Sequence, residues 1–151
     1  DRKNGYQLAL AKHGLSIRSE YCVEVPNISQ GGTEKIASLL LQEEPPTAIV
    51  VSDDILAVSL ERVCMQNHVL IPDNLSIISF NNSLFARLTS PQLTSIDINS
   101  HQLGIEAATQ MISHIENPKL VATKIIVPHH LIERDSCCKI STACSSSDNI
   151  R

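Results

Sequence analysis

Hydrophobic positions along the chain follow two spacings, one typical of helices and one typical of strands. Stretches with apolar residues three and four positions apart predict amphipathic helices, whereas short apolar runs bounded by glycine, proline or polar residues predict strands. The predicted helices cover residues 2–13, 33–44, 54–67 and 100–116. The predicted strands cover residues 21–25, 48–51, 76–80, 93–98, 124–127 and 130–132.

This alternation of strands and helices predicts an α/β fold. Strands separated by helices usually pair in parallel, because the helix returns the chain to the same edge of the sheet. We therefore expect a mostly parallel, open sheet flanked by helices. The stretch 81–92 is polar and irregular, and the serine-rich residues 136–151 lack periodicity. We expect residues 136–151 to form a disordered tail.

Composition and charge argue against several classes of protein. The chain has 151 residues, of which 42% are hydrophobic and 19% charged, with a formal net charge of −4. No apolar stretch approaches the roughly 18 residues of a transmembrane helix, and the first residues lack the apolar core of a signal peptide. We therefore expect a cytoplasmic protein with no membrane partner. Basic residues are scattered among acidic ones, so we do not expect this chain to bind nucleic acid by itself.

The cysteines point to the same compartment. Their number is odd and no CxxC pair occurs, which makes a disulfide framework improbable and fits a reducing environment. The five cysteines are Cys22, Cys64, Cys137, Cys138 and Cys144.

Polar side chains follow two of the predicted parallel strands. Ser52, Asp53 and Asp54 come after the strand 48–51, and Asn81 and Asn82 come after the strand 76–80. Ligands of open parallel sheets bind at the carboxyl ends of the strands. Carboxylates and amides there suit a polyhydroxylated ligand, since they form paired hydrogen bonds with neighbouring hydroxyls.

Each of these residues also has a purely structural alternative. Asp53 or Asp54 could simply cap the following helix, and for Asp54 we expect this role. Asn81 and Asn82 could serve a turn, because asparagine tolerates the left-handed backbone region.

The sequence offers little in favour of an enzyme or a metal protein. It contains no GxSxG, P-loop or GxGxxG motif, so we expect no catalytic residue and no cofactor. His129 and His130 lie near Cys137 and Cys138, which could suggest zinc. Adjacent residues of a strand point to opposite faces, however, so both histidines cannot reach one ion, and we expect no metal site.

Four stretches resemble the lactose/galactose-repressor family of bacterial transcription regulators. RKNGYQLALAKHG is similar to its arginine–glycine–aromatic helix signature, and TAIVVSDDILAVSLERVCMQNHVLIPDNLSIISFNN to its longest signature. SPQLTSIDINSHQLGIEAA and IIVPHHLIERDSC resemble the two segments that follow. The resemblance spans roughly residues 1–138 in the same order and spacing. Within the family, residues 80–99 are most similar to maltose-operon repressors of Gram-positive bacteria.

The resemblance implies a periplasmic-binding-protein-like fold of two subdomains with an effector in the cleft between them. Residues 1–98 and 119–135 would form the C-terminal subdomain, and residues 99–118 a helix of the N-terminal subdomain. The rest of that subdomain and the operator-binding headpiece are expected outside this sequence. The apolar stripe of Leu103, Met111 and Ile115 would then be exposed or packed against another molecule.

The resemblance also assigns effector-binding residues. Arg2 matches the family's effector-binding arginine, while Asp53 and Asn81 match polar residues after two strands. Phe80 would stand beside them as a wall for stacking a sugar. The alternatives are a solvated Arg2 and a Phe80 that belongs only to the core.

The function implied is that of the sugar-sensing, effector-binding and dimerisation part of a transcriptional repressor. A saccharide, maltose or a relative of it, would be the effector. A second copy would bind through residues 54–67 and 91–95, and operator DNA would bind only through the headpiece. The main alternative is part of a sugar-binding protein without a DNA function, and a weaker one is part of an α/β enzyme.

Overall fold

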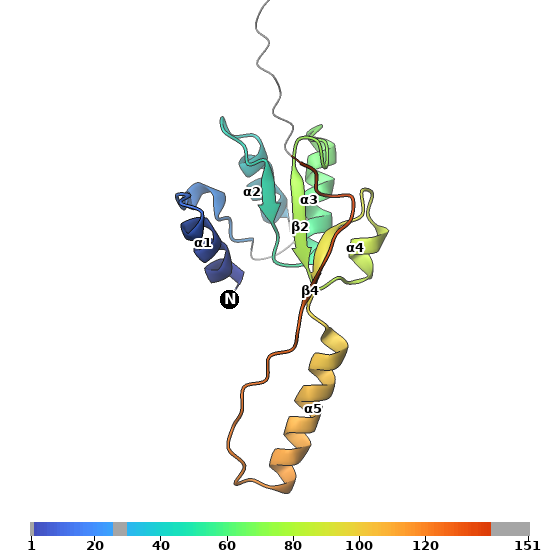
Figure 1. Cartoon of the computed structure of the whole chain (residues 1–151). Helices are drawn as coiled ribbons and strands as arrows, with labels where there is room; N and C mark the ends of the chain where they lie inside the picture. The colour runs from blue at the N-terminus through green and yellow to red at the C-terminus, as the bar shows by residue number, and fades with distance from the viewer. Residues whose placement is uncertain (1, 26–29, 140–151) are drawn as a thin grey trace, which may run out of the picture.

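The computed structural model describes residues 2–25 and 30–139 (Figure 1). The helices are α1 (Arg2–Lys12), α2 (Gln30–Leu40), α3 (Asp54–Gln66), α4 (Leu84–Leu88) and α5 (Ser100–Glu116), with a 3-10 helix, η1 (Ser19–Tyr21). The strands are β1 (Ala48–Val50), β2 (Ser76–Phe80), β3 (Thr94–Asp97) and β4 (His130–Ile132).

One four-stranded sheet organises the fold, in the order β1-β2-β3-β4. Strands β1, β2 and β3 are parallel, with Ile49 opposite Ile77 and Ile78 opposite Thr94. Strand β4 is antiparallel to β3. The predicted fold class, an α/β fold with a mostly parallel open sheet flanked by helices, is therefore confirmed.

An apolar cluster joins α2 and α3 to the sheet. Ile36 and Leu40 of α2 and Leu60 of α3 are buried, as their helical spacing predicts. Ile77 of β2 and Leu93, which precedes β3, are completely buried in the same cluster. The core thus fixes β2 and β3 in place. The polar residues that follow β2 are therefore attached to a strand that is itself anchored in the core.

Helix α5 lies outside this core. It extends away from the sheet, and the chain after it returns beside it to β4 (Figure 1). None of its residues is buried, and Leu103, Met111 and Ile115 are 47%, 67% and 72% exposed. The predicted bounds of this helix are confirmed, and its apolar stripe is open on the described part of the molecule.

Three secondary-structure predictions were wrong. Residues 21–25 contain no strand, and neither do residues 124–127. A short apolar run forms a strand only when a second strand accepts its hydrogen bonds, and no described residue forms a ladder with either run. The stretch 81–92 contains α4, a short helix that buries Ala86 and whose polar flanks concealed it.

The ordered fold also continues beyond position 135, where the tail was predicted to begin. Ser136 is completely buried. Its hydroxyl donates to the carbonyl of Ile77 at 2.6 Å and accepts from the amide of Thr94 at 2.8 Å. Ser136 therefore joins β2 to β3, which a serine-rich composition could not reveal. Residues 140–151, the rest of the predicted tail, lie outside the described residues.

Candidate functional site

Arg2 brings three of the four predicted site residues together. Its Nη1 donates to the carbonyl of Ser52 at 2.6 Å, and its Nη2 donates to Oδ1 of Asn81 at 3.3 Å. The guanidinium also lies over the ring of Phe80, 4.5 Å from the centroid. The first residue of α1 thus reaches the carboxyl ends of β1 and β2, so Arg2 is not merely a solvated arginine.

Phe80 serves Arg2 in this arrangement. The last residue of β2 is half-buried, and one face of its ring carries the guanidinium. A cation over an aromatic face is attracted by the electron-rich ring, which favours one orientation of the arginine. That face of Phe80 is a platform for Arg2 rather than a free wall for a sugar.

Asp53 is the N-cap of α3. Its Oδ1 accepts a hydrogen bond from the amide of Leu56 at 2.9 Å, and its backbone is extended. Oδ2 accepts from the hydroxyl of Ser52 at 3.0 Å. Asp53 therefore makes the helix-capping hydrogen bond that the structural alternative predicts. The same residue lies next to Ser52, whose carbonyl binds Arg2, so Asp53 borders the group formed by Arg2, Phe80 and Asn81.

Asp54 does not cap the helix, and that prediction was wrong. Its side chain turns inward and is 1% exposed. Oδ1 accepts from the hydroxyls of Ser79 at 2.6 Å and Ser95 at 2.8 Å, and Oδ2 accepts from the amide of Ser83 at 2.6 Å. Asp54 thus connects α3 to β2, to β3 and to the turn after β2.

The charge of Asp54 is stabilised in spite of its burial. Burial by itself raises the pKa of the carboxyl, since it disfavours the ionised form. The hydrogen bonds from Ser79, Ser83 and Ser95 together outweigh burial and hold the pKa below its ordinary value. Asp54 is therefore a buried carboxylate that accepts from β2, from β3 and from the turn after β2.

Asn81 and Asn82 form the turn that the structural alternative predicts. Their φ angles are 97° and 46°, in the left-handed region that asparagine tolerates better than most residues. The amide of Asn82 donates to the hydroxyl of Ser95 at 3.0 Å. The turn role of both residues is correct, and it is this turn that directs the Asn81 side chain toward Arg2.

A second polar cluster, which sequence reasoning missed, lies behind this turn. Nδ2 of Asn82 donates to Asp97 at 3.0 Å, and Oδ1 of Asn82 accepts from Arg134. Arg134 also donates to the carbonyl of Leu93 at 2.6 Å. Hydrogen bonds from Asn82 and from the amide of Asn99 lower the pKa of Asp97. No spacing in the sequence signals this cluster, because its members come from three distant segments.

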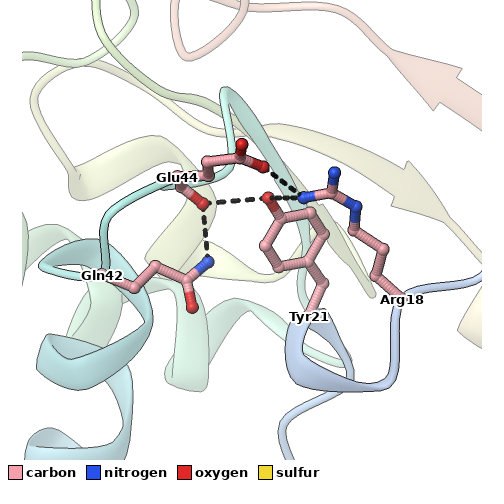
Figure 2. Close-up of polar contacts among 4 residues, drawn as sticks. All are labelled: Arg18, Tyr21, Gln42 and Glu44. Carbon is pink, nitrogen blue, oxygen red and sulfur yellow. Dashed lines mark hydrogen bonds and ion pairs between the residues drawn. The ribbon is translucent and has the colours of Figure 1, made fainter.

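The chain after α1 is tied down separately, by the four residues that we call the Arg18 cluster: Arg18, Tyr21, Gln42 and Glu44. Figure 2 shows Arg18 reaching both the Tyr21 hydroxyl, at 2.9 Å, and the Glu44 carboxylate, at 2.7 Å. The carbonyl of Glu44 accepts from Tyr21 at 2.9 Å and from Gln42 at 2.8 Å. The cluster joins η1 to the loop before β1, whereas α1 itself buries no residue.

Other kinds of site find no support among the described residues. No group of three histidine, cysteine or acidic side chains in residues 2–25 and 30–139 could hold a metal ion. The four cysteines in those ranges are free. No helix in that part of the chain is long and apolar enough to cross a membrane.

Comparison with known proteins agrees with this fold. A family model described as a periplasmic binding protein-like domain matches residues 1–137. The chain belongs to this family. The resemblance to LacI-type regulators is confirmed at the level of this domain, while the finer likeness to maltose-operon repressors is not shown.

Members of the family with similar sequences are transcription regulators. The probable HTH-type transcriptional repressor ExuR of Bacillus subtilis (strain 168) is 28% identical over 141 residues, which are 93% of this chain and 42% of that protein. The ribose operon repressor of Haemophilus influenzae (strain ATCC 51907 / DSM 11121 / KW20 / Rd) is 29% identical over 136 residues, 90% of this chain and 41% of that protein.

A solved structure shows the same domain. The LacI transcriptional regulator from Bacillus cereus subsp. cytotoxis NVH 391-98 superposes with a TM-score of 0.83 and 32% identity, covering 90% of this chain and 48% of that one. The chain spans about two fifths of the length of the curated relatives named above. These relatives are regulators and not enzymes, so the enzyme alternative is not favoured.

Proposed function

We propose that this chain is the sugar-sensing, effector-binding and dimerisation part of a DNA-binding transcriptional repressor. The observation that supports it most is the convergence of Arg2 and Asn81, which lie 79 positions apart, at the carboxyl ends of β1 and β2. A periplasmic-binding-protein-like sheet binds ligands at these ends. One relative, the ribose operon repressor, bears the name of a sugar operon.

The chemistry of the site fits a sugar. An arginine carries five N–H donors, and the contacts of Arg2 with Ser52 and Asn81 leave others for hydroxyl oxygens. Asp53 accepts hydrogen bonds from hydroxyls, and Asn81 both donates and accepts. Phe80 contributes by holding Arg2 in place. We propose maltose or a related saccharide as the effector, on the resemblance of residues 80–99.

The proposed mechanism is effector-controlled DNA binding. Residues 1–98 and 119–135 would form one wall of the cleft, and residues 99–118 would belong to the facing subdomain. A sugar that binds the closed cleft more tightly than the open one shifts the protein toward the closed state. That shift would change the dimer and lower its affinity for operator DNA, which a separate headpiece binds in the cytoplasm.

Replacing Arg2 by alanine is expected to weaken saccharide binding by roughly ten- to hundredfold, because a charged hydrogen-bond donor is worth about 1.5–3 kcal/mol. The measurement is an NMR titration of the ¹⁵N-labelled chain with maltose and, separately, ribose. This method detects millimolar affinities. Lys124→Ala is the control, since Lys124 is exposed between α5 and β4, outside the proposed site and the proposed dimerisation segments.

The same titration tests the proposed function. Binding that shifts the resonances of Asp53 and Asn81, and that disappears in an Asp53→Ala, Asn81→Ala double variant, supports it. If neither saccharide shifts these resonances at tens of millimolar, the sugar-sensing role is wrong. Shifts that survive in the double variant would place the effector elsewhere.

We further propose that a second copy binds over α3 and α4. Five large apolar side chains of these helices are exposed: Ile55, Met65, Leu84, Phe85 and Leu88. Monomeric proteins rarely leave such groups together in water. The position agrees with the dimerisation segments that the family resemblance implies, residues 54–67 and 91–95.

Leu88→Asp is expected to convert a dimer to a monomer, because a buried charge opposes association. Sedimentation equilibrium at micromolar concentrations measures the change. Leu8→Asp is the matched control, since Leu8 is equally exposed on α1. A strict monomer in the parent chain at high micromolar concentration would contradict the proposal.

The runner-up, part of a sugar-binding protein without a DNA function, is not favoured, because the relatives that match over most of this chain are transcription regulators.

A further inference from the structure

The residues of the proposed site come from three different parts of the fold. Arg2 and Asp53 lie at the beginnings of α1 and α3, and Asn81 lies on the turn after β2. Hydrogen bonding to one ligand requires these side chains to keep a fixed separation. A contact within the fold must therefore fix the position of the turn after β2 relative to the N-terminus of α3.

We propose that Asp54 is the positioning residue that fixes the turn of Asn81, Asn82 and Ser83 and so sets the separation between Asn81 and Asp53. This inference rests on the proposed function. Asp54 follows Asp53 directly in the chain, so its backbone is next to one residue of the site. Its side chain binds the turn that carries Asn81, another residue of the site.

Two hydrogen-bonded routes lead from Asp54 to the turn. Oδ2 accepts the amide of Ser83 directly at 2.6 Å. Oδ1 accepts a hydrogen bond from the hydroxyl of Ser95 at 2.8 Å, and the oxygen of the same hydroxyl accepts one from the amide of Asn82 at 3.0 Å. The carboxylate thus controls two consecutive amides of the turn, one through each oxygen.

The turn needs such support because of its backbone. Two consecutive non-glycine residues with positive φ are unfavourable for L-amino acids, even for asparagine. Without contacts that fix them, the backbone at Asn81 and Asn82 would relax and the Asn81 side chain would leave Arg2. The contacts with Asp54 and Ser95 oppose that relaxation, alongside the bonds of Asn82 to Asp97 and Arg134 and of the Asn81 amide to Ile96.

A carboxylate suits this position better than an amide. Three donors converge on Asp54, and an ionised carboxylate accepts at both oxygens. In Asp54→Asn one oxygen becomes an NH₂ group, which at the Oδ1 position would make the hydroxyls of Ser79 and Ser95 accept instead of donate. The hydroxyl of Ser95 would then accept from two donors, and the charge of the acceptor is lost, so the isosteric change weakens the route through Ser95 without emptying the space.

The chain offers a matched pair of serines for the test. Ser79 and Ser95 are both completely buried, and both hydroxyls donate to Oδ1 of Asp54. Only Ser95 also accepts from the turn, through the amide of Asn82. Ser79→Ala and Ser95→Ala each remove one hydrogen bond from the same carboxylate, but only Ser95→Ala interrupts a route to the turn.

Two readouts distinguish positioning from general stability. Ser95→Ala is expected to speed amide hydrogen exchange at Ser83, and Asp54→Asn at Asn82, by about five- to tenfold, the effect of about one hydrogen bond. Both variants are expected to weaken maltose or ribose binding by a similar factor. Ser79→Ala is expected to leave exchange and binding within about twofold, although it loses a bond of the same kind.

Equal losses of affinity in Ser79→Ala and Ser95→Ala, in proportion to their unfolding free energies, would overturn the inference. Asp54 would then only stabilise the fold. If the parent chain binds neither saccharide, the proposed function fails. Amide hydrogen exchange then tests the positioning role of Asp54 independently of ligand binding. Unchanged exchange at Ser83 in Ser95→Ala would contradict a positioning role, whereas a selective increase would support it.

Discussion

Replacing Asp54 by alanine is expected to lower the free energy of unfolding by about 3 kcal/mol, because three donors, two of them buried, lose their acceptor. The donors are the hydroxyls of Ser79 and Ser95 and the amide of Ser83. Part of the cost is recovered where the hydroxyls rotate to other acceptors. Urea denaturation of the two chains at neutral pH measures the difference.

The neighbouring aspartate provides the contrast. Asp53→Ala removes only the cap of α3, which is worth about 1 kcal/mol. Equal effects of the two substitutions would contradict the assigned roles.

The effect of Asp54→Ala is also expected to depend on pH. The folded pKa lies below the ordinary value of 3.8, so the contribution of Asp54 is complete above that pH. It is lost as the pH falls through the folded pKa.

Ile77→Ala is expected to lower the free energy of unfolding by about 3–4 kcal/mol. Ile77 is completely buried in β2, the second strand of the sheet, and belongs to the apolar cluster shared with α2 and α3. The substitution leaves a cavity that a sheet paired on both sides cannot close. The same denaturation measurement checks it.

Ile126→Ala is the matched control. Ile126 is 77% exposed in the segment between α5 and β4, so removing the same atoms should change stability by less than about 0.5 kcal/mol. A similar loss in both variants would mean that residues 119–129 pack against a partner in solution.

Sequence patterns predicted the elements whose signal is local. The strand 76–80 and the helix 100–116 were obtained with the observed bounds, since apolar spacing and flanking breakers define them. Strands 21–25 and 124–127 were wrong, because an apolar run does not say whether another strand lies beside it. Ser136 was missed for a related reason: its burial depends on Ile77 and Thr94, far away in the chain.

The candidate site shows the same division. Position after a strand was sufficient to select Asp53 and Asn81, and the family resemblance added Arg2. The sequence could not say which of two adjacent aspartates caps α3 and which turns inward, since either fits an N-cap pattern. The cluster of Asn82, Asp97 and Arg134 depends wholly on tertiary structure.

Helix α1 supplies Arg2 to the site, yet it buries no side chain. Elements with few buried contacts open more readily than the rest of a protein, so the arginine is less firmly placed than Asn81 on the turn after β2. A ligand that engages both must also order α1, and part of its binding free energy goes into that ordering. Gly5 lies within this helix, with open space where a side chain would be. The proposed effector sensitivity is therefore adjustable through the helix propensity of α1, by residues outside the proposed site.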